Sequence, residues 1–167
     1  MSGSDLDRLS SPTRERDGVT ILDIDHYAPF LLNAVSSAWQ RQTSAIYRSR
    51  FELGIVDWRV IAMLNIEPDI TANRVCEVIR LDKAAVSRSL KQLNERGLVD
   101  YEASATDPRK RRWRLTEAGH RTHADLLDVA LRCEAQMLAD IPPDELEMFL
   151  KTMRHMLRNL DRITLGD

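Results

Sequence analysis

A short stretch near the middle of the chain concentrates side chains that can bind phosphate groups. Five of the six positions from 109 to 114 are Lys or Arg, whereas the whole chain carries a net charge of −2. Residues 80–121 contain eleven basic and six acidic residues, which gives that segment a net charge of +5 and leaves −7 for the rest. A basic protrusion gains affinity for a nucleic-acid duplex by displacing condensed counterions, so the pattern favours DNA as a partner. The competing interpretation is a solvated, salt-bridged turn, which is the usual meaning of a charge run.

Two short helices before the basic stretch help to decide between these interpretations. Thr71 is a typical N-cap for a helix over 71–80, and Asp82 is one for a helix that ends before Gly97. The second helix has an apolar inner side formed by Val86, Leu90 and Leu93. Two short helices joined by a tight turn predict a helix-turn-helix, whose second helix can enter a DNA groove.

The residues after Gly97 change from helical to strand-like periodicity. Apolar and polar residues alternate over 98–104 and again over 112–115, and residues 105–111 have the composition of a turn. A hairpin that directly follows a helix-turn-helix indicates a winged helix, with the basic residues at and beside the tip of the wing. This context favours the DNA interpretation over the salt-bridged turn.

The remaining segments predict helices around the winged helix. Apolar residues at helical spacing predict helices over about 25–50, 55–66, 117–139 and 144–162. We therefore expect a mainly α fold with a small β-hairpin wing. Its parts are a disordered tail (1–19), an N-terminal dimerisation helix (20–54), a winged helix-turn-helix DNA-binding domain (55–116) and C-terminal dimerisation helices (117–167). The terminal helices carry apolar faces that a small winged helix alone cannot cover, which predicts a homodimer. No apolar run is long enough to span a membrane and no secretory leader is present, so we expect a cytoplasmic protein without a membrane partner.

The candidate DNA contacts differ in role between the helices and the hairpin. The first turns of a recognition helix read base edges, and small side chains there allow close approach. Arg88 has the chemistry for a bidentate contact with guanine, and equally for a contact with phosphate. At the tip of the hairpin, Arg109 suits a narrow minor groove, and Asp107 is expected to orient it by an ion pair. The full set of candidates is Thr71, Asn73, Lys83, Ala84, Ser87, Arg88, Lys91, Asp107, Arg109, Lys110 and Arg111.

Five motifs lie within residues 55–119: W-x-V from Trp58, L-D-K-x-x-V-S-R from Leu81, L-x-x-x-G-L-V from Leu93, D-P-R-K from Asp107 and L-T-x-x-G from Leu115. With these motifs, the segment resembles the MarR family of bacterial transcriptional regulators. The resemblance implies a homodimer that places one winged helix per subunit on a palindromic operator, with terminal helices that interlock as the dimerisation domain.

The same resemblance assigns roles to particular residues. It implies that Asp107 and Arg109 form the wing pair, and that Ser87 and Arg88 are contacts of the recognition helix. The chain departs from the family pattern at Asp57, where a Gln or similar residue is common, and at Val75-Cys76, where Leu-Ala is usual. We interpret both departures as packing or surface variation.

The resemblance also implies an effector pocket between the dimerisation helices and the winged helix, for a small aromatic carboxylate or its thioester. Aromatic rings can form the walls, and His or Arg can pair with the carboxylate. The candidates are His26, Tyr27, Phe30, Trp39, Trp58, Arg59 and Met63. His26 is favoured because packing explains a polar residue beside Tyr27 and Phe30 poorly, whereas Trp58 and Phe30 are more typical of a core. We expect a ligand in this pocket to lower the affinity for DNA. The protein would then be a ligand-responsive regulator, and we expect a repressor.

Other classes of function have weaker support. The chain has no Gly-rich phosphate loop, nucleophile elbow or His-Glu-x-x-His motif, so we expect neither an enzyme nor a cofactor. His120 and His123 follow Glu117 on one helix as a candidate metal pair, although surface His pairs are common. Cys76 and Cys133 fit apolar helix faces without an activating cluster. A redox sensor and a constitutive DNA-binding regulator remain the alternatives.

Overall fold

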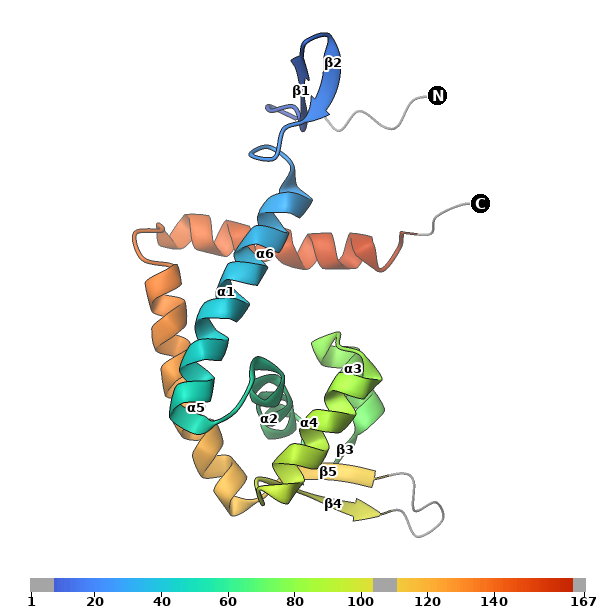
Figure 1. Cartoon of the computed structure of the whole chain (residues 1–167), viewed down its shortest axis with the longest axis vertical. Helices are drawn as coiled ribbons and strands as arrows, with labels where there is room; N and C mark the ends of the chain where they lie inside the picture. The colour runs from blue at the N-terminus through green and yellow to red at the C-terminus, as the bar shows by residue number, and fades with distance from the viewer. Residues whose placement is uncertain (1–7, 104–110, 164–167) are drawn as a thin grey trace. The chain divides into compact units, whose positions relative to one another are not determined.

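The fold comes from a computed structural model, in which residues 8–103 and 111–163 are described (Figure 1). In chain order the elements are β1 (Thr13–Arg16), β2 (Val19–Leu22), α1 (Ala28–Phe51), α2 (Ile55–Ile66), β3 (Ile70–Thr71), α3 (Ala72–Ile79), α4 (Lys83–Glu95), β4 (Val99–Ala103), β5 (Arg111–Leu115), α5 (Glu117–Met137) and α6 (Pro143–Leu160). The predicted fold class is confirmed, because the chain is mainly helical and the antiparallel strands β4 and β5 form a wing. The chain divides after Leu126 into two compact units, and α5 runs from the first into the second.

Helices α2, α3 and α4 pack with a small antiparallel sheet in the first unit (Figure 1). The sheet has the order β3-β5-β4, so β5 lies in the middle and pairs with β4 from Val99↔Leu115 to Ala103↔Arg111. Strand alternation turns Trp113 and Leu115 into the core, as their sequence spacing predicts. The other core side chains of this part include Val60, Ile61, Leu64, Val75, Val86, Leu90, Leu93, Leu98 and Val99.

The short strand β3 is an element that the sequence did not predict. It consists of two residues that pair with Trp113 and Arg112 of β5. Two residues are too few to show a period in the sequence. The strand matters because it places the start of α3 directly beside the wing.

The long helix α1 is buried only near its end. It begins at Ala28, three residues later than predicted, because Pro29 lacks an N–H and fits only the first turn of a helix. Its buried residues are Thr43, Ser44 and Tyr47. The first half instead exposes large apolar side chains, namely Phe30, Leu31 and Val35.

An antiparallel hairpin precedes α1. Strands β1 and β2 pair from Thr13↔Leu22 to Arg16↔Val19. The turn residues Asp17 and Gly18 both have positive φ, 54° and 74°, as a type I′ turn requires. This finding corrects the disordered tail predicted for residues 1–19, over the part from residue 13. The polar composition suggested disorder, whereas the Asp-Gly turn chemistry brings the two strands together.

The start of α5 is fixed to the wing through Gly119. The Thr116 hydroxyl donates to the Gly97 carbonyl over 2.7 Å and accepts from the Gly119 N–H over 3.0 Å. The Thr116 N–H donates to the Leu98 carbonyl. A Cβ added at Gly119 would overlap the Leu98 carbonyl oxygen, so no other residue fits without a shift of the backbone. This geometry explains the Thr and Gly of the L-T-x-x-G motif.

The second unit holds the last part of α5 and the whole of α6. Helix α6 begins at Pro143, where the missing N–H is tolerated. None of its side chains is buried, and its exposed apolar residues include Met148, Phe149, Leu157 and Leu160. Helix α6 therefore presents apolar side chains to solvent. Over the described residues, the helices are too short or too polar to cross a membrane.

Candidate nucleic-acid interface

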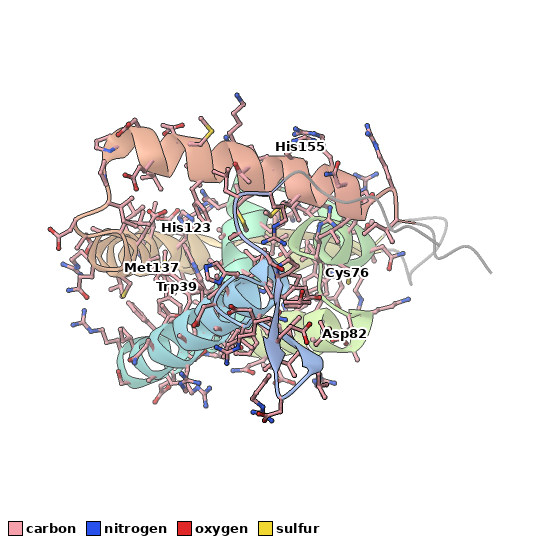
Figure 2. The ribbon with its side chains drawn as sticks, turned by 90° about the horizontal axis from the view of Figure 1, so that it is seen from above. Trp39, Cys76, Asp82, His123, Met137 and His155 are labelled. Atoms are coloured by element: carbon pink, nitrogen blue, oxygen red, sulfur yellow. The ribbon has the colours of Figure 1, made fainter. Side chains whose placement is uncertain are left out.

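Helix α4 is positioned by its cap and its apolar side. Asp82, at the start of the helix (Figure 2), accepts a hydrogen bond from the Ala85 N–H over 2.9 Å, as the N-cap prediction requires. The side chains that fix the inner side are the buried Val86, Leu90 and Leu93. The adjoining side exposes residues at a spacing of four, namely Lys83, Ser87 and Lys91. The helix therefore presents two cations and a hydroxyl along one line.

A buried carboxylate ties α4 to α2. Asp57 is 6% exposed, and its Oδ2 accepts from the Gly54 N–H over 2.8 Å at the start of α2. Its Oδ1 accepts from the buried Ser89 hydroxyl of α4 over 2.6 Å. The two oxygens thus cap one helix and hold another. The departure at Asp57 is a packing feature, one of the two interpretations that the sequence left open.

A second tie joins the end of α4 to the end of α1. Arg96 donates from Nη1 to the Glu52 carbonyl over 2.9 Å and from Nη2 to the Phe51 carbonyl over 3.0 Å. A cation is favourable there because the last carbonyls of a helix lack partners and carry partial negative charge. Together with the Ser89 bond, this contact fastens α4 to the corner between α1 and α2.

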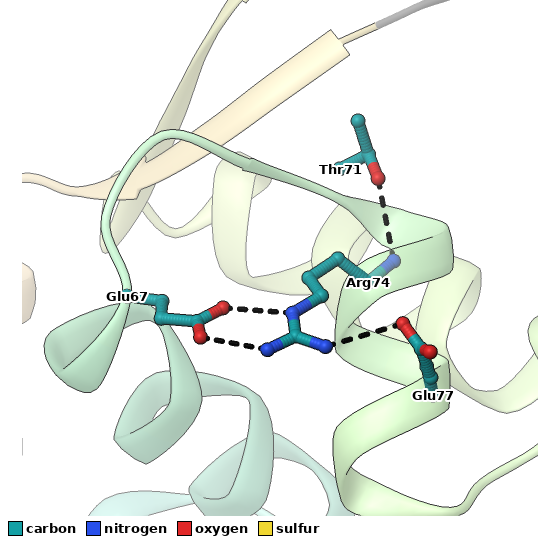
Figure 3. A network of polar contacts seen from close by, with 4 residues as sticks. All are labelled: Glu67, Thr71, Arg74 and Glu77. Carbon is teal, nitrogen blue, oxygen red and sulfur yellow. Dashed lines mark hydrogen bonds and ion pairs between the residues drawn. The ribbon is translucent and has the colours of Figure 1, made fainter.

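Helix α3 starts with a compact polar network (Figure 3). The Thr71 hydroxyl accepts from the Arg74 N–H over 3.3 Å, which confirms the predicted N-cap. The Arg74 guanidinium lies 2.8 Å from Glu67 and 3.2 Å from Glu77. Its hydrogen bond with Glu67 lowers the pKa of that carboxyl and raises the pKa of Arg74. Two carboxylates therefore compensate the charge of Arg74.

The wing has an acidic face that holds Arg114. Its guanidinium lies 3.2 Å from Asp69, 3.7 Å from Glu102 and 3.9 Å from Asp100. Arg112, two residues earlier on the same face of β5, donates to the Asp69 carbonyl over 3.3 Å. The salt-bridged interpretation of the charge run is therefore correct for Arg114.

The other face of the wing is aromatic. The Cζ atom of Arg111 lies 4.1 Å from the centre of the Tyr101 ring. The Tyr101 ring packs in turn on Trp113, with centroids 4.9 Å apart and planes tilted by 55°. A cation over an aromatic face is attracted by the negative charge density of that face. This arrangement keeps the charge of Arg111 next to a neutral group.

These elements line an open groove of about 670 Å³. The start of α3, the exposed side of α4 and β5 contribute its walls: Thr71, Ala72, Asn73, Lys83, Ser87, Leu90, Lys91, Asn94, Arg111 and Trp113. The cations come from two different elements, and the apolar floor comes from Leu90 and Trp113. The groove combines cations, hydroxyls and amides, which is the chemistry that contacts a phosphate backbone.

The structure brings six of the predicted DNA contacts together in this groove, namely Thr71, Asn73, Lys83, Ser87, Lys91 and Arg111. Ala84 and Arg88 are exposed on α4 and do not line it. Asp107, Arg109 and Lys110 lie outside the described residues, so the predicted wing pair stays a prediction.

The predicted effector residues fall into two groups. His26, Tyr27 and Phe30 lie at the start of α1, whereas Trp58 packs on Tyr47 near its end, with ring centroids 6.2 Å apart. Seventeen residues of helix separate Phe30 from Tyr47, which corresponds to about 25 Å at 1.5 Å per residue. Within one protomer, the start of α1 and Trp58 therefore cannot line the same small pocket.

The first group has an acidic neighbour. The His26 Nδ1 lies 3.2 Å from the Asp23 carboxylate, and this hydrogen bond lowers the pKa of Asp23. A ligand carboxylate at His26 would compete with Asp23 for the imidazole. The residue favoured from the sequence is therefore already paired.

The second group centres on Trp58. Trp39 lies one helical turn before the buried Thr43, and its carbonyl oxygen accepts a hydrogen bond from the Thr43 hydroxyl. Arg59 is half-buried, whereas Met63 is 4% exposed and belongs to the core. The Trp58 ring stacks on His123 of α5, with centroids 5.7 Å apart and planes 29° apart.

The two histidines of the candidate metal pair are engaged in packing and hydrogen bonding. Burial of His123, and then the nearby charge of His120, lower the pKa of His123. The His120 Nδ1 lies 3.2 Å from Asn65 Oδ1. Residues 8–103 and 111–163 contain no group of three or more potential metal ligands. Cys76 (Figure 2) and Cys133 are half-buried free thiols.

Sequence reasoning missed the residues that hold this interface in place. Tyr101 carried a detectable signal, because it lies two residues from the strand position opposite Arg111 and cross-strand diagonals of this kind interact. Ser89 and Arg96 contact residues 32 and at least 44 positions away, which no local period indicates.

Comparisons with known proteins agree with this geometry. Residues 52–110 match the model of the MarR family. A MarR/EmrR family transcriptional regulator from Acinetobacter sp. ADP1 is 26% identical, over 85% of this chain and 100% of that chain, with a TM-score of 0.78. The PcaV transcriptional regulator from Streptomyces coelicolor, solved with its natural ligand, is 24% identical over 83% and 96%, with a TM-score of 0.70. CouR from Rhodococcus jostii RHA1, bound to p-coumaroyl-CoA, is 19% identical over 87% and 99%, with a TM-score of 0.70.

Proposed function

Because this chain belongs to the MarR family of transcriptional regulators, we propose that it is a repressor that binds a palindromic operator as a homodimer. A small aromatic carboxylate or its thioester releases it from DNA. A two-fold dimer matches a palindrome because its two recognition helices meet successive major grooves, about 34 Å apart.

The observation that carries the DNA-binding proposal is the groove shared by α3, α4 and β5. Lys83 and Lys91 border it from α4, and Arg111 borders it from the wing. Arg74 and Arg114, by contrast, lie against carboxylates outside it. Lys91 also lies 3.8 Å from Glu95, with both side chains exposed. Lys83 and Arg111 are the groove cations that pair with no carboxylate among the described residues, and a phosphate backbone fits them.

A salt titration with a duplex of random sequence tests this assignment. We expect Lys83→Ala to weaken binding and to reduce the slope of log affinity against log salt by about one. Lys151→Ala is the matched control, because it removes the same charge from exposed α6. Equal effects of the two variants would overturn the groove as the interface.

Arg88 tests base recognition separately. It is exposed on α4 outside the groove lining, and its reading of bases or phosphates is still open. If Arg88 reads a base, Arg88→Ala lowers the preference for a selected operator over random duplex. If it contacts only phosphate, both affinities fall alike and the salt slope shrinks by about one.

The support for a homodimer is the exposed apolar surface of the terminal helices. The first half of α1 exposes Phe30 and Val35, and α6 exposes Met148 and Phe149. An interface that covers these side chains would remove apolar surface from water, which favours association. Sedimentation at micromolar concentration should give a dimer, and a stable folded monomer would refute the proposal.

The support for an effector is the pair of ligand-bound relatives and the aromatic group around Trp58. We place the ligand ring near Trp39 and Trp58, with Arg59 as a partner for its carboxylate. A panel of aromatic acids and their thioesters should raise the melting temperature and release DNA. Release requires that the ligand prefer the DNA-incompetent arrangement, by about 1–3 kcal/mol for a 5- to 150-fold response.

Two variants locate the effector. Arg59→Ala should weaken the ligand and leave ligand-free DNA binding nearly intact. His26→Ala should leave the affinity for the ligand unchanged if the ligand contacts residues of one protomer only. If His26→Ala weakens ligand binding and Arg59→Ala does not, the ligand binds at the start of α1. A panel that neither stabilises the protein nor releases DNA would remove the effector from the proposal.

A further inference from the structure

Neighbouring arginines of β5 lie on opposite faces of the wing, because successive residues of a strand point to opposite sides. Arg112 and Arg114 share one face of β5 with the carboxylates of Asp69, Asp100 and Glu102 around them. Arg111 and Trp113 share the opposite face. Strand alternation therefore gives neighbouring arginines different surroundings, one acidic and one aromatic.

Tyr101 stands where it can hold Arg111. It pairs with Trp113 across the hairpin, and Ala103 pairs with Arg111. Tyr101 and Arg111 are therefore diagonal neighbours on one face, a separation that an aromatic ring and a long side chain can bridge. The 4.1 Å from the Arg111 Cζ to the Tyr101 ring centre shows that they do.

The ring of Tyr101 is itself fixed. It packs at 4.9 Å on Trp113, which is 6% exposed and lies between β3 and β4 in the sheet. The stack runs from the core through Trp113 and Tyr101 to the guanidinium, which reaches the groove. The exposed end of a flexible side chain is thus anchored to a buried residue.

An aromatic ring and a carboxylate can both hold an arginine, but they differ in whether its charge and its N–H groups stay available to another partner. A carboxylate neutralises the arginine and occupies its in-plane N–H groups, as around Arg114. A ring attracts the guanidinium through its face and does not neutralise its charge, so the N–H groups at the edge can donate to a phosphate. The aromatic contact therefore orders the Arg111 side chain without neutralising its charge.

We propose that Tyr101 is the positioning residue for Arg111, and that the pair forms a phosphate-binding arm of the wing beside the groove. The inference rests on the proposed DNA binding. It assigns to the strands of the wing a contact separate from the predicted tip pair of Asp107 and Arg109. Its partner is the phosphate backbone of duplex DNA, irrespective of sequence.

A double-mutant cycle on the full-length protein tests the proposal with a random-sequence duplex. Tyr101→Leu should weaken binding about 2- to 5-fold, the range of a cation–aromatic contact at an exposed site. Arg111→Ala should weaken binding and reduce the salt slope by about one. In the Arg111→Ala background, Tyr101→Leu should have no further effect. Tyr101→Phe keeps the ring and should bind within twofold of the natural protein.

The same cycle separates positioning from a general loss of structure. If Tyr101→Leu weakens binding equally with and without Arg111, the residue acts through the fold of the wing and the proposal is overturned. Equal weakening by Tyr101→Phe and Tyr101→Leu overturns it as well. Arg111→Lys covers the case in which Tyr101→Leu does not fold. It should weaken binding with an unchanged salt slope, and binding equal to that of the natural protein refutes the arm. Failure of the natural protein to bind any duplex at low salt would instead refute the proposed function.

Discussion

Replacement of Asp57 by Ala tests whether a buried hydrogen bond fastens the recognition helix to α2. The substitution removes two acceptors, the one for the Gly54 N–H and the one for the Ser89 hydroxyl. Ser89 is 4% exposed, so water cannot readily replace the lost partner. The variant should therefore affect the corner between α1 and α2 and the position of α4 together.

The expected magnitude follows from these two bonds. A hydrogen bond to a carboxylate contributes about 1.5–3 kcal/mol, and loss of a helix N-terminal acceptor costs about 0.5–2 kcal/mol. Removal of a buried carboxylate also relieves its desolvation, which offsets part of the loss. We expect Asp57→Ala to lower the free energy of unfolding by about 2–4 kcal/mol. Ser89→Ala breaks one bond and should cost about 1–3 kcal/mol.

Urea unfolding of both single variants and the double variant measures the coupling. The protomer concentration is held fixed, because association of subunits changes apparent stability. The shared bond is lost only once in the double variant, so its cost should fall short of the summed single costs by about 1–2 kcal/mol. Ser87→Ala, an exposed serine on the same helix, should stay within about 0.5 kcal/mol of the natural protein. Additivity within about 0.5 kcal/mol would refute the tie between the helices.

Three further predictions concern other contacts. Gly119→Ala should lower the free energy of unfolding by about 2–3 kcal/mol, because its Cβ overlaps the Leu98 carbonyl. Gly54→Ala meets only an ordinary contact and should cost about 1 kcal/mol or less. Equal costs of the two variants in urea unfolding would contradict the overlap. Arg96→Ala should cost about 1–2 kcal/mol through loss of two carbonyl contacts, with Arg96→Lys intermediate; an unchanged unfolding midpoint for Arg96→Ala would show that the contacts contribute nothing. The lowered pKa of His123 means that the unfolded state binds the proton more readily, so stability should be full above pH 6.5 and decline as the pH falls below that value towards the lowered pKa. Melting curves from pH 5 to 7.5 should show a shallower decline for His123→Phe, and identical pH profiles would argue against this linkage.

The sequence predicted those parts of the fold that local chemistry determines. Thr71 and Asp82 cap the helices that they were expected to cap, since a side-chain oxygen before a helix has few other uses. Trp113 and Leu115 are buried because a strand alternates its faces. Six of the ten groove residues were among the expected DNA contacts, because a helix-turn-helix followed by a hairpin fixes which sides face outward, whereas Ala72, Leu90, Asn94 and Trp113 were not.

Long-range contacts and weak local signals escaped prediction. The bond between Ser89 and Asp57 joins residues 32 positions apart, and no periodicity encodes it. The effector residues were grouped by type, whereas the length of α1 separates His26 from Trp58. The hairpin before α1 was missed because β1 is polar and fully exposed, and because each strand has only four residues, so the Asp-Gly turn was its strongest signal.

The contact of Arg96 with α1 has a consequence for how the two helices can diverge in evolution. Its acceptors are main-chain carbonyls of Phe51 and Glu52, which every amino acid supplies. Substitution of Phe51 or Glu52 should therefore leave both hydrogen bonds in place, although a change of Glu52 removes a carboxylate 4.0 Å from the Arg96 guanidinium. Few side chains other than arginine can reach both oxygens at once. The hydrogen bonds that hold α4 against α1 therefore depend on the identity of Arg96 and little on the identity of the two residues that supply the carbonyls. Sequence change at these two positions is compatible with an unchanged position of the helix that borders the groove.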